Sequence, residues 1–160
     1  MASAESSVEL IRKAILENGF YFSKDTTVGE RVEKMDEDAT PFASAGGLQF
    51  CKVNVLDNPC IRPVLDSFFE WFGLGLYRSF GARPGDYTFR KSDPESEVDC
   101  LLVHLLRKGS MVTFWGGSHG HLLPSIKGEN NLLLVPRAFL RSLRRHGVLP
   151  TKVLFEHGGL

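Results

Sequence analysis

The 160-residue sequence is poor in cysteine and has no excess of charge, and these absences already exclude several classes of protein. Its three cysteines form no CxxC pair, which excludes a disulfide-rich scaffold and a structural zinc module. Nineteen basic and nineteen acidic side chains cancel, which argues against a protein that coats nucleic acid or an anionic membrane. No apolar run approaches the roughly 20 residues of a membrane-spanning helix, and the first residues do not resemble a signal or transit peptide. We therefore expect a single cytoplasmic domain over residues 1–160.

The spacing of apolar residues predicts three helices, over residues 6–18, 63–72 and 136–146. Ser6 and Glu9 have the spacing of a capping box at the start of the first helix. A glycine follows each predicted helix directly, at the position where a left-handed residue commonly ends a helix.

Alternating or continuous apolar residues predict strands at 20–22, 48–55, 101–106, 110–115, 132–135 and 152–156. The short link at 107–109 favours a hairpin between the third and the fourth of these strands. Residues 24–47 are acidic and rich in turn-forming residues, so we expect an irregular loop there. Together these elements predict an α+β fold with a mainly antiparallel sheet.

The densest cluster of residues that could carry chemistry is the segment GGSHGHLLP at 116–124, directly after the strand that ends at Trp115. His119 and His121 are two positions apart on an extended segment, so their rings could reach one ion. The neighbouring glycines allow a ligand or another stretch of backbone to come close. A glycine-rich turn of this kind also serves as an ordinary hydrogen-bonding loop, and the spacing alone leaves both interpretations open.

Three stretches of the sequence resemble the phytanoyl-CoA dioxygenase-like proteins. They are KGSMVTFWGGSHGHLLP at 108–124, where a strand runs into a GSH turn, ENGFYF at 17–22 after a helix, and FEHGGL at 155–160. The resemblance implies part of a double-stranded β-helix of the jelly-roll or cupin type, with a helix at the amino terminus and another near the carboxy terminus. It also implies a non-haem iron oxygenase that uses Fe(II) and 2-oxoglutarate to act on a small organic substrate.

Iron in such enzymes is held by two His and one carboxylate. The resemblance carries over Ser118 and His119 as members of the GSH turn, and these are the expected cofactor-binding residues. A non-standard metal site would combine His119, His121 and an acid such as Asp93. No His is followed two positions later by Asp or Glu, and the distal His of the family has no counterpart here. We therefore expect a shortened or degenerate member in which oxygenase activity is reduced or lost.

The predicted helix at 136–146 carries four arginines, Arg137, Arg141, Arg144 and Arg145. Their spacing places them on one side of the helix, and no acid occurs between Glu129 and Glu156. This face is either a solvated outer surface or a docking site for phosphate, a CoA-like nucleotide or an acidic protein, since a guanidinium fork matches paired oxygens. The alternative function is a non-catalytic ligand- or partner-binding domain that uses this helix.

The remaining expectations concern partners and packing. No aromatic residues interleave with the four arginines, which argues against nucleic acid as a partner. An incomplete β-helix would leave an unpaired sheet edge, which favours a homodimer or a protein partner at that edge. His104 and the three cysteines lie among apolar neighbours, and we expect them to be packing residues.

Overall fold

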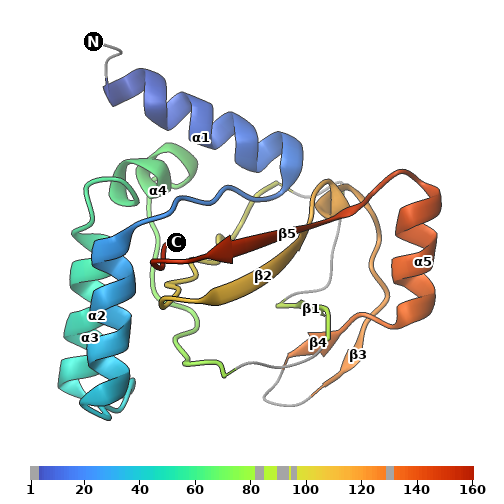
Figure 1. Ribbon diagram of the computed structural model, residues 1–160. Helices are drawn as coiled ribbons and strands as arrows, with labels where there is room; N and C mark the ends of the chain where they lie inside the picture. The colour runs from blue at the N-terminus through green and yellow to red at the C-terminus, as the bar shows by residue number, and fades with distance from the viewer. Residues whose placement is uncertain (1–3, 82–84, 90–93, 95–96, 129–131) are drawn as a thin grey trace.

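The computed structural model describes residues 4–81, 85–89, 94, 97–128 and 132–160. Along the chain its elements are α1 (Ala4–Asn18), α2 (Thr26–Glu37), α3 (Ala45–Cys51), the π-helix η1 (Lys52–Leu56), α4 (Arg62–Phe68), β1 (Tyr87–Thr88), β2 (Ser110–Trp115), the 3-10 turn η2 (Ser118–Gly120), β3 (Ile126–Lys127), β4 (Leu133–Leu134), α5 (Arg137–Arg145) and β5 (Pro150–Phe155). This mixture of helices and small antiparallel sheets confirms the predicted α+β class, and the described strands close no barrel (Figure 1).

The longer of the two sheets pairs β2 with β5. The six residues of β2 lie antiparallel to the six of β5, with Ser110 opposite Phe155. The second sheet has the strand order β1–β4–β3. The strands predicted at 110–115 and 152–156 are confirmed, and the one predicted at 132–135 shortens to β4.

The hairpin predicted between residues 101–106 and 110–115 is wrong. Residues 101–105 form no strand, and Leu106 makes a single bridge to Gly159. That bridge continues the register of β2 with β5, so both sides of the turn at 107–109 face the same partner segment. The chain passes along β5 instead of folding back, because this pairing buries the apolar side of β5.

An aromatic cluster joins the segment after α1 to the β2–β5 sheet. The ring of Phe20 stacks on that of Phe114 with the centroids 4.5 Å apart, and Phe22 meets Phe155 edge-on at 5.9 Å. Phe155 is completely buried. Backbone hydrogen bonds also join residues 23–25 to the carboxy-terminal segment. The strand predicted at 20–22 is therefore an extended segment that packs through its rings, and the only bridge nearby falls just beyond it.

The irregular loop predicted for residues 24–47 is wrong, because most of this stretch is helical. Asp25 caps α2, its carboxylate accepting a hydrogen bond of 3.1 Å from the amide of Val28. Val28, Val32 and Met35 follow at helical spacing, and Val28 is buried in the core. The prediction of a loop gave most weight to the acidic run at the end of α2 and missed this short apolar stripe.

The strand predicted at 48–55 is also wrong, since α3 and η1 occupy this region. The hydroxyl of Ser44 caps α3 by accepting from the amide of Gly47 at 3.1 Å. Asn54 on η1 is buried, accepts from the guanidinium of Arg31 on α2 at 3.1 Å and donates to a carbonyl one turn earlier. The buried amide of Asn54 has these hydrogen-bond partners only when the segment is helical. Its hydrogen bonds therefore outweigh the alternation of apolar residues that predicted a strand.

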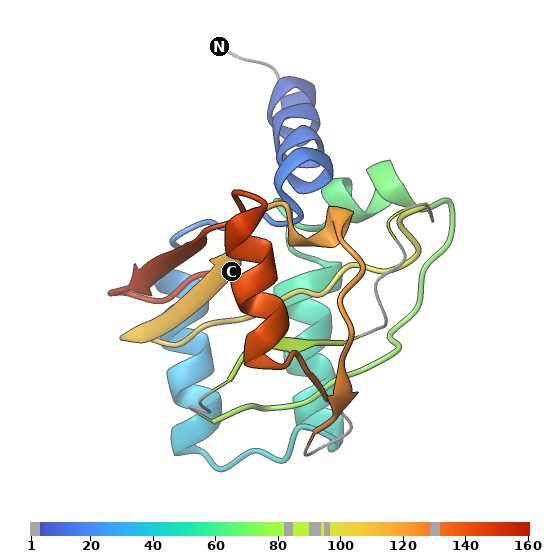
Figure 2. The same ribbon diagram turned by 90° about the vertical axis from the view of Figure 1, so that its right-hand side faces the viewer.

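The first and third predicted helices are confirmed as α1 and α5, and the second shortens to α4. Arg12 joins α1 to α4, donating to the carbonyl of Ser67 at 3.1 Å and lying 4.9 Å over the ring of Phe68. Figures 1 and 2 show α2 and α3 near one end of the β2 and β5 strands and α5 near the other end. None of the described helices combines the length and the apolar character needed to cross a membrane.

Candidate functional site

Helix α5 is set by local sequence at both ends. Pro136 precedes its first turn, and Gly147 follows its end with the left-handed φ of +84°. The amide of Val148 donates to the carbonyl of Leu143 at 3.0 Å, and both side chains are buried. This arrangement fixes which side of α5 faces the core and which side faces outward.

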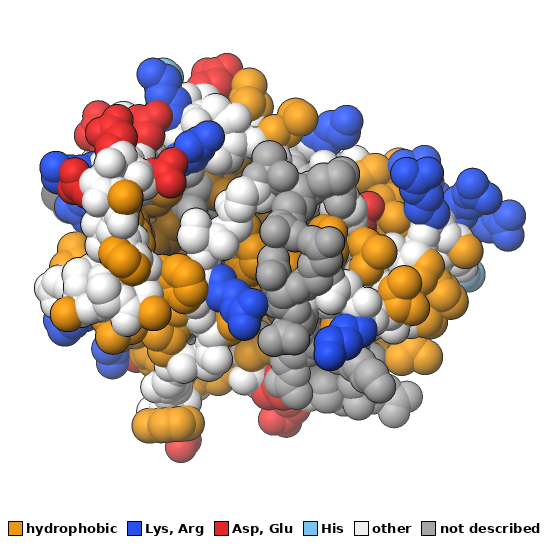
Figure 3. Space-filling view, turned by 90° about the horizontal axis from the view of Figure 1, so that it is seen from below, with side chains coloured by type: hydrophobic (Ala, Val, Ile, Leu, Met, Phe, Trp, Pro, Cys, Tyr) orange, Lys and Arg blue, Asp and Glu red, His pale blue; other side chains and the backbone are white. Residues whose placement is uncertain are grey.

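The outward side carries the four predicted arginines, and we call it the basic face: Arg137, Arg141, Arg144 and Arg145. At 100° per residue they fall within an arc of about 100°, on the side opposite to the buried Leu143. All four are exposed, and none forms an ion pair in the part of the chain that the structure describes. Figure 3 shows blue side chains gathered at the right-hand end of the molecule, where α5 lies.

The charges of the basic face are unfavourable for the helix itself. Arg141 is four residues from both Arg137 and Arg145, and like charges at this spacing destabilise a helix. Arg137 also stands at the amino-terminal end, where the helix dipole is positive, and the first turn contains no acid. An anionic partner would remove both costs.

Aromatic side chains border the carboxy-terminal half of the basic face. The guanidinium of Arg144 lies 5.5 Å from the centre of the Trp115 ring, and the indole Nε1 donates to a carboxylate oxygen of Asp86 at 2.6 Å. The rings of His121 and His146 are in contact, with their centroids 5.8 Å apart. The sequence did not identify Trp115 or His146 as part of this surface, because only the fold brings β2 beside α5.

His119 packs against the end of α1. Its Nε2 lies 3.0 Å from the carbonyl oxygen of Leu16, in the last turn of the helix. Gly19 lies against the same imidazole, and a Cβ at this position would overlap the ring. Gly19 also has a φ of +78°, so the turn after α1 requires glycine for two reasons. The histidine of the GSH turn therefore joins β2 to α1.

The described residues do not assemble an iron site. No three His, Cys, Asp or Glu side chains among them gather closely enough to hold a metal ion. His119 contacts α1, whereas the ring of His121 contacts α5, and Asp93 lies outside the described residues. Ser118 lies in η2, where its carbonyl accepts from the amide of His121 at 3.1 Å. These residues do not fit the facial set of ligands that iron oxygenases use.

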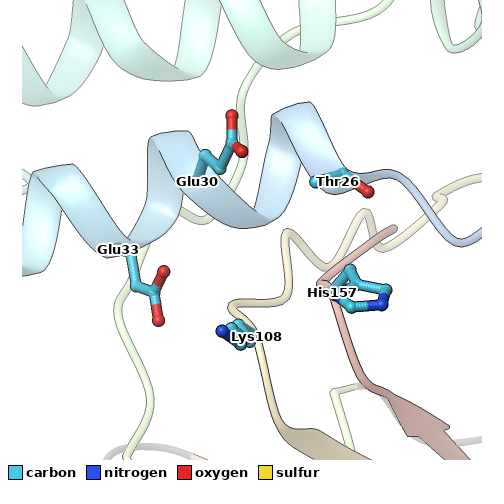
Figure 4. A pocket seen from close by; sticks show the side chains of 5 residues that line it. All are labelled: Thr26, Glu30, Glu33, Lys108 and His157. Atoms are coloured by element: carbon cyan, nitrogen blue, oxygen red, sulfur yellow. The ribbon is translucent and has the colours of Figure 1, made fainter.

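A small pocket of about 170 Å³ opens between α2 and the turns beside the β2–β5 sheet. Its lining residues, shown in Figure 4, are Thr26, Glu30, Glu33, Lys108 and His157. In this view Glu33 descends from α2 toward the turn that carries Lys108, whereas Glu30 points to the other side of the helix. The two carboxylates therefore point away from each other. The pocket is an open part of the acidic surface of α2 and does not form a closed site.

The buried thiol of Cys51 on α3 lies near the phenol of Tyr77. The hydroxyl of Tyr77 donates to the carbonyl of Gly47 at 2.9 Å. Burial raises the pKa of Cys51, and burial together with the nearby Cys51 charge raises the pKa of Tyr77. Both groups are therefore protonated at neutral pH, which argues against Cys51 as a nucleophile. The expectation that all three cysteines are packing residues is wrong for Cys60 and Cys100, which are exposed.

Comparisons with protein-family models, curated proteins and solved structures gave no match to this chain. The proposals below therefore depend on the charges, packing and exposed surfaces of the chain itself.

Proposed function

We propose that the chain is a non-catalytic binding domain whose basic face on α5 docks an acidic protein surface. The observation that carries this proposal is the set of four exposed arginines on one helix, with no ion pair among the described residues. Solvated helix faces commonly mix charges of both signs, but this face has none of the opposite sign. Arginine also pairs with two carboxylate oxygens at once, which favours carboxylates as ligands.

The length of the basic face supports a protein partner over a single small anion. Arg137 and Arg145 are eight residues apart, which corresponds to about 12 Å along the helix axis. One phosphate group would contact only part of this row, whereas carboxylates on an acidic helix can follow its whole length. Trp115 lies at the end of the row, and tryptophan is among the residue types that contribute most to protein interfaces.

The test uses a fluorescein-labelled oligoglutamate peptide as the probe and fluorescence anisotropy as the measurement. The triple variant R141Q/R144Q/R145Q should bind the peptide roughly tenfold more weakly than the unchanged protein, because rim and surface charges govern such association. The matched control K13Q/K34Q/K52Q loses the same number of charges from exposed positions on other elements and should bind as before. Equal loss in both variants, with both folded by circular dichroism, would contradict a docking site on α5.

A second candidate function is that of the phytanoyl-CoA dioxygenase-like oxygenases, with their partial double-stranded β-helix. The observation that favours it is that all three stretches of resemblance meet in space. Phe20 stacks on Phe114, the amide of Gly117 donates to the carbonyl of Asn18 at 2.8 Å, and residue 160 pairs with residue 23 through two backbone hydrogen bonds. Segments that belong to one structural unit are expected to pack together in this way.

Fe(II) and 2-oxoglutarate are the cofactors of this second candidate, and they would supply its oxidative chemistry. Ser118, His119, His121 and Asp93 remain the residues proposed to hold them, although the described part of the chain assembles no set of metal ligands. Incubation with Fe(II) and 2-oxoglutarate, followed by assays of protein-bound iron and released succinate, tests the candidate. Retained iron and succinate that both disappear in H119A/H121A would support it. An absence of both in the unchanged protein would refute it.

A further inference from the structure

We propose that the acidic surface docked by the basic face is helix α2 of a second copy of this chain. This inference rests on the proposed function, because it identifies the partner of the same surface. Copies of the chain would then associate head to tail, with α5 of one copy against α2 of the next.

The outer side of α2 carries three acids, and we call it the acidic face: Glu30, Glu33 and Glu37. Their spacing of i, i+3 and i+7 places them within an arc of about 60°. Glu30 and Glu37 are exposed, Glu33 is half-buried, and none of the three forms an ion pair in the part of the chain that the structure describes. Lys108 lies beside this face at the pocket, on the side to which Glu33 points, and it forms no ion pair with the three acids in the described part of the chain.

The acids beside the acidic face, at the end of α2 and at its C-cap, already have partners. Asp36 accepts from the guanidinium of Arg107 at 2.9 Å, and Asp38 lies 3.5 Å from the ammonium of Lys34. The fold therefore neutralises the acids beside the acidic face and leaves the face itself charged. This selectivity distinguishes the acidic face from a general excess of acid in α2.

The two faces match in spacing when the helices run antiparallel. Glu30 to Glu37 and Arg137 to Arg144 each span seven residues, which is about 10 Å along the axis. In the antiparallel arrangement the pairs are Glu30 with Arg144, Glu33 with Arg141, and Glu37 with Arg137. Each carboxylate then meets one guanidinium at the same level of the helix.

The charges at the helix ends favour the antiparallel orientation independently. Glu37 stands at the carboxy-terminal end of α2 and Arg137 at the amino-terminal end of α5, and each has the wrong sign for the dipole of its own helix. In the antiparallel pair these two side chains meet, and the dipoles of the two helices oppose each other favourably. The interaction therefore offsets an internal cost on both helices.

The two faces cannot meet within one molecule, because α2 and α5 lie at opposite ends of the β2 and β5 strands (Figure 1). Figure 3 shows the same separation, with red side chains gathered at the upper left and blue ones at the right. A contact between two different surfaces of one chain is heterologous, and it propagates unless its rotation closes a ring. We therefore expect assemblies that grow with protein concentration.

Sedimentation analysis of the unchanged protein gives the first test. At low ionic strength the mean mass should rise above the 17.8 kDa of one chain as the concentration increases. In about 0.5 M NaCl it should return to 17.8 kDa, because salt screens exposed charges beyond a few ångströms. A mass that stays at 17.8 kDa at every concentration in low salt would overturn the proposal.

Charge reversal gives the second test, which also identifies the faces. The variants E30R/E33R/E37R and R137E/R141E/R144E should each be monomeric alone, because each has two faces of the same sign. Mixed together they should assemble as the unchanged protein does, since each α5 face then meets an oppositely charged α2 face on the other variant. A chain with all six reversals should regain the self-association of the unchanged protein.

The outcomes separate this inference from the proposed function. If the unchanged protein binds oligoglutamate through α5 but never self-associates, and the two variants do not combine, the basic face has a different acidic partner and the self-docking inference is wrong. If R137E/R141E/R144E assembles as the unchanged protein does, α5 is not the interface between copies and the self-docking inference fails; the proposed function fails only if the unchanged protein also does not bind oligoglutamate through α5. Circular dichroism of each variant, and recovery by the sixfold reversal, exclude misfolding as the cause of a lost complex.

Discussion

The imidazole Nε2 of His119 lies 3.0 Å from the carbonyl oxygen of Leu16, although 103 residues separate the two in the sequence. A carbonyl oxygen only accepts hydrogen bonds, so Nε2 carries the proton in this contact. The bond satisfies one of the carbonyl groups that the end of a helix leaves without a partner. The GSH turn thereby fixes β2 to the end of α1, which is a structural role for its histidine.

Replacing His119 by alanine should lower the free energy of unfolding by about 1 kcal/mol, because it removes this hydrogen bond. Urea denaturation followed by circular dichroism measures the change. His157→Ala provides the control, since that imidazole is exposed as His119 is but makes no side-chain hydrogen bond in the described part of the chain, and it should change stability by less than about 0.5 kcal/mol. Equal stabilities for the two variants would contradict the structural role of His119.

Replacing Gly29 by alanine should destabilise the fold by about 1–3 kcal/mol, the usual cost of forcing extra atoms into a packed site. A Cβ at this buried position would overlap the carbonyl oxygen of His157, so α2 could no longer lie against the carboxy-terminal segment. Thermal unfolding measures the effect. Gly75→Ala is the matched control, because its Cβ would meet nothing within 4 Å. A Gly29→Ala protein as stable as the control would disprove this close approach.

Stability should fall as the pH drops below about 6.5 because of His104. Burial lowers the pKa of this half-buried imidazole from 6.5, so the folded protein keeps it neutral while the unfolded chain takes up a proton. The free energy of unfolding is therefore unaffected by this group above pH 6.5 and falls progressively in more acidic solution. His104→Gln removes the titrating group and should flatten the dependence of the unfolding free energy on pH between about 7 and 5. Parallel curves for the two proteins would refute the assignment.

Cys60 and Cys100 should react with a thiol reagent in the folded protein, whereas Cys51 should not. The first two are exposed, and Cys51 is buried with a raised pKa, so little thiolate forms there. Counting the thiols that react with Ellman's reagent before and after unfolding in guanidinium measures the difference. Rapid modification of all three in the folded protein would contradict the burial of Cys51, and a C51S variant would show which thiol had reacted.

Elements whose signals are local were predicted well from the sequence. Helix α5 is predicted because Pro136 and Gly147 mark its limits and Leu143 lies opposite its arginines. The strands β2 and β5 follow from alternation in their own residues. The basic face was predicted for the same reason, since helical geometry alone places its members on one side.

Predictions that depended on a distant partner were wrong. The hairpin failed because β2 pairs with β5, some 40 residues farther along the chain, and not with its neighbour. The strand at 48–55 failed because Asn54 is satisfied by Arg31 on α2, a contact that periodicity does not reveal. The cofactor and metal residues of the oxygenase hypothesis and the open sheet edge as an interface remain predictions.

The sequence by itself determined the chain's helical ends, its two longest strands and the basic face of α5, because hydrophobic periodicity, capping and charge act between near neighbours. Only the tertiary structure decided that β2 pairs with β5, that His119 contacts α1, and that the acidic and basic faces lie on opposite sides of one molecule. These relationships depend on burying Phe155 and its neighbours against distant segments. The hydrophobic free energy of this burial is gained only when those segments have packed together.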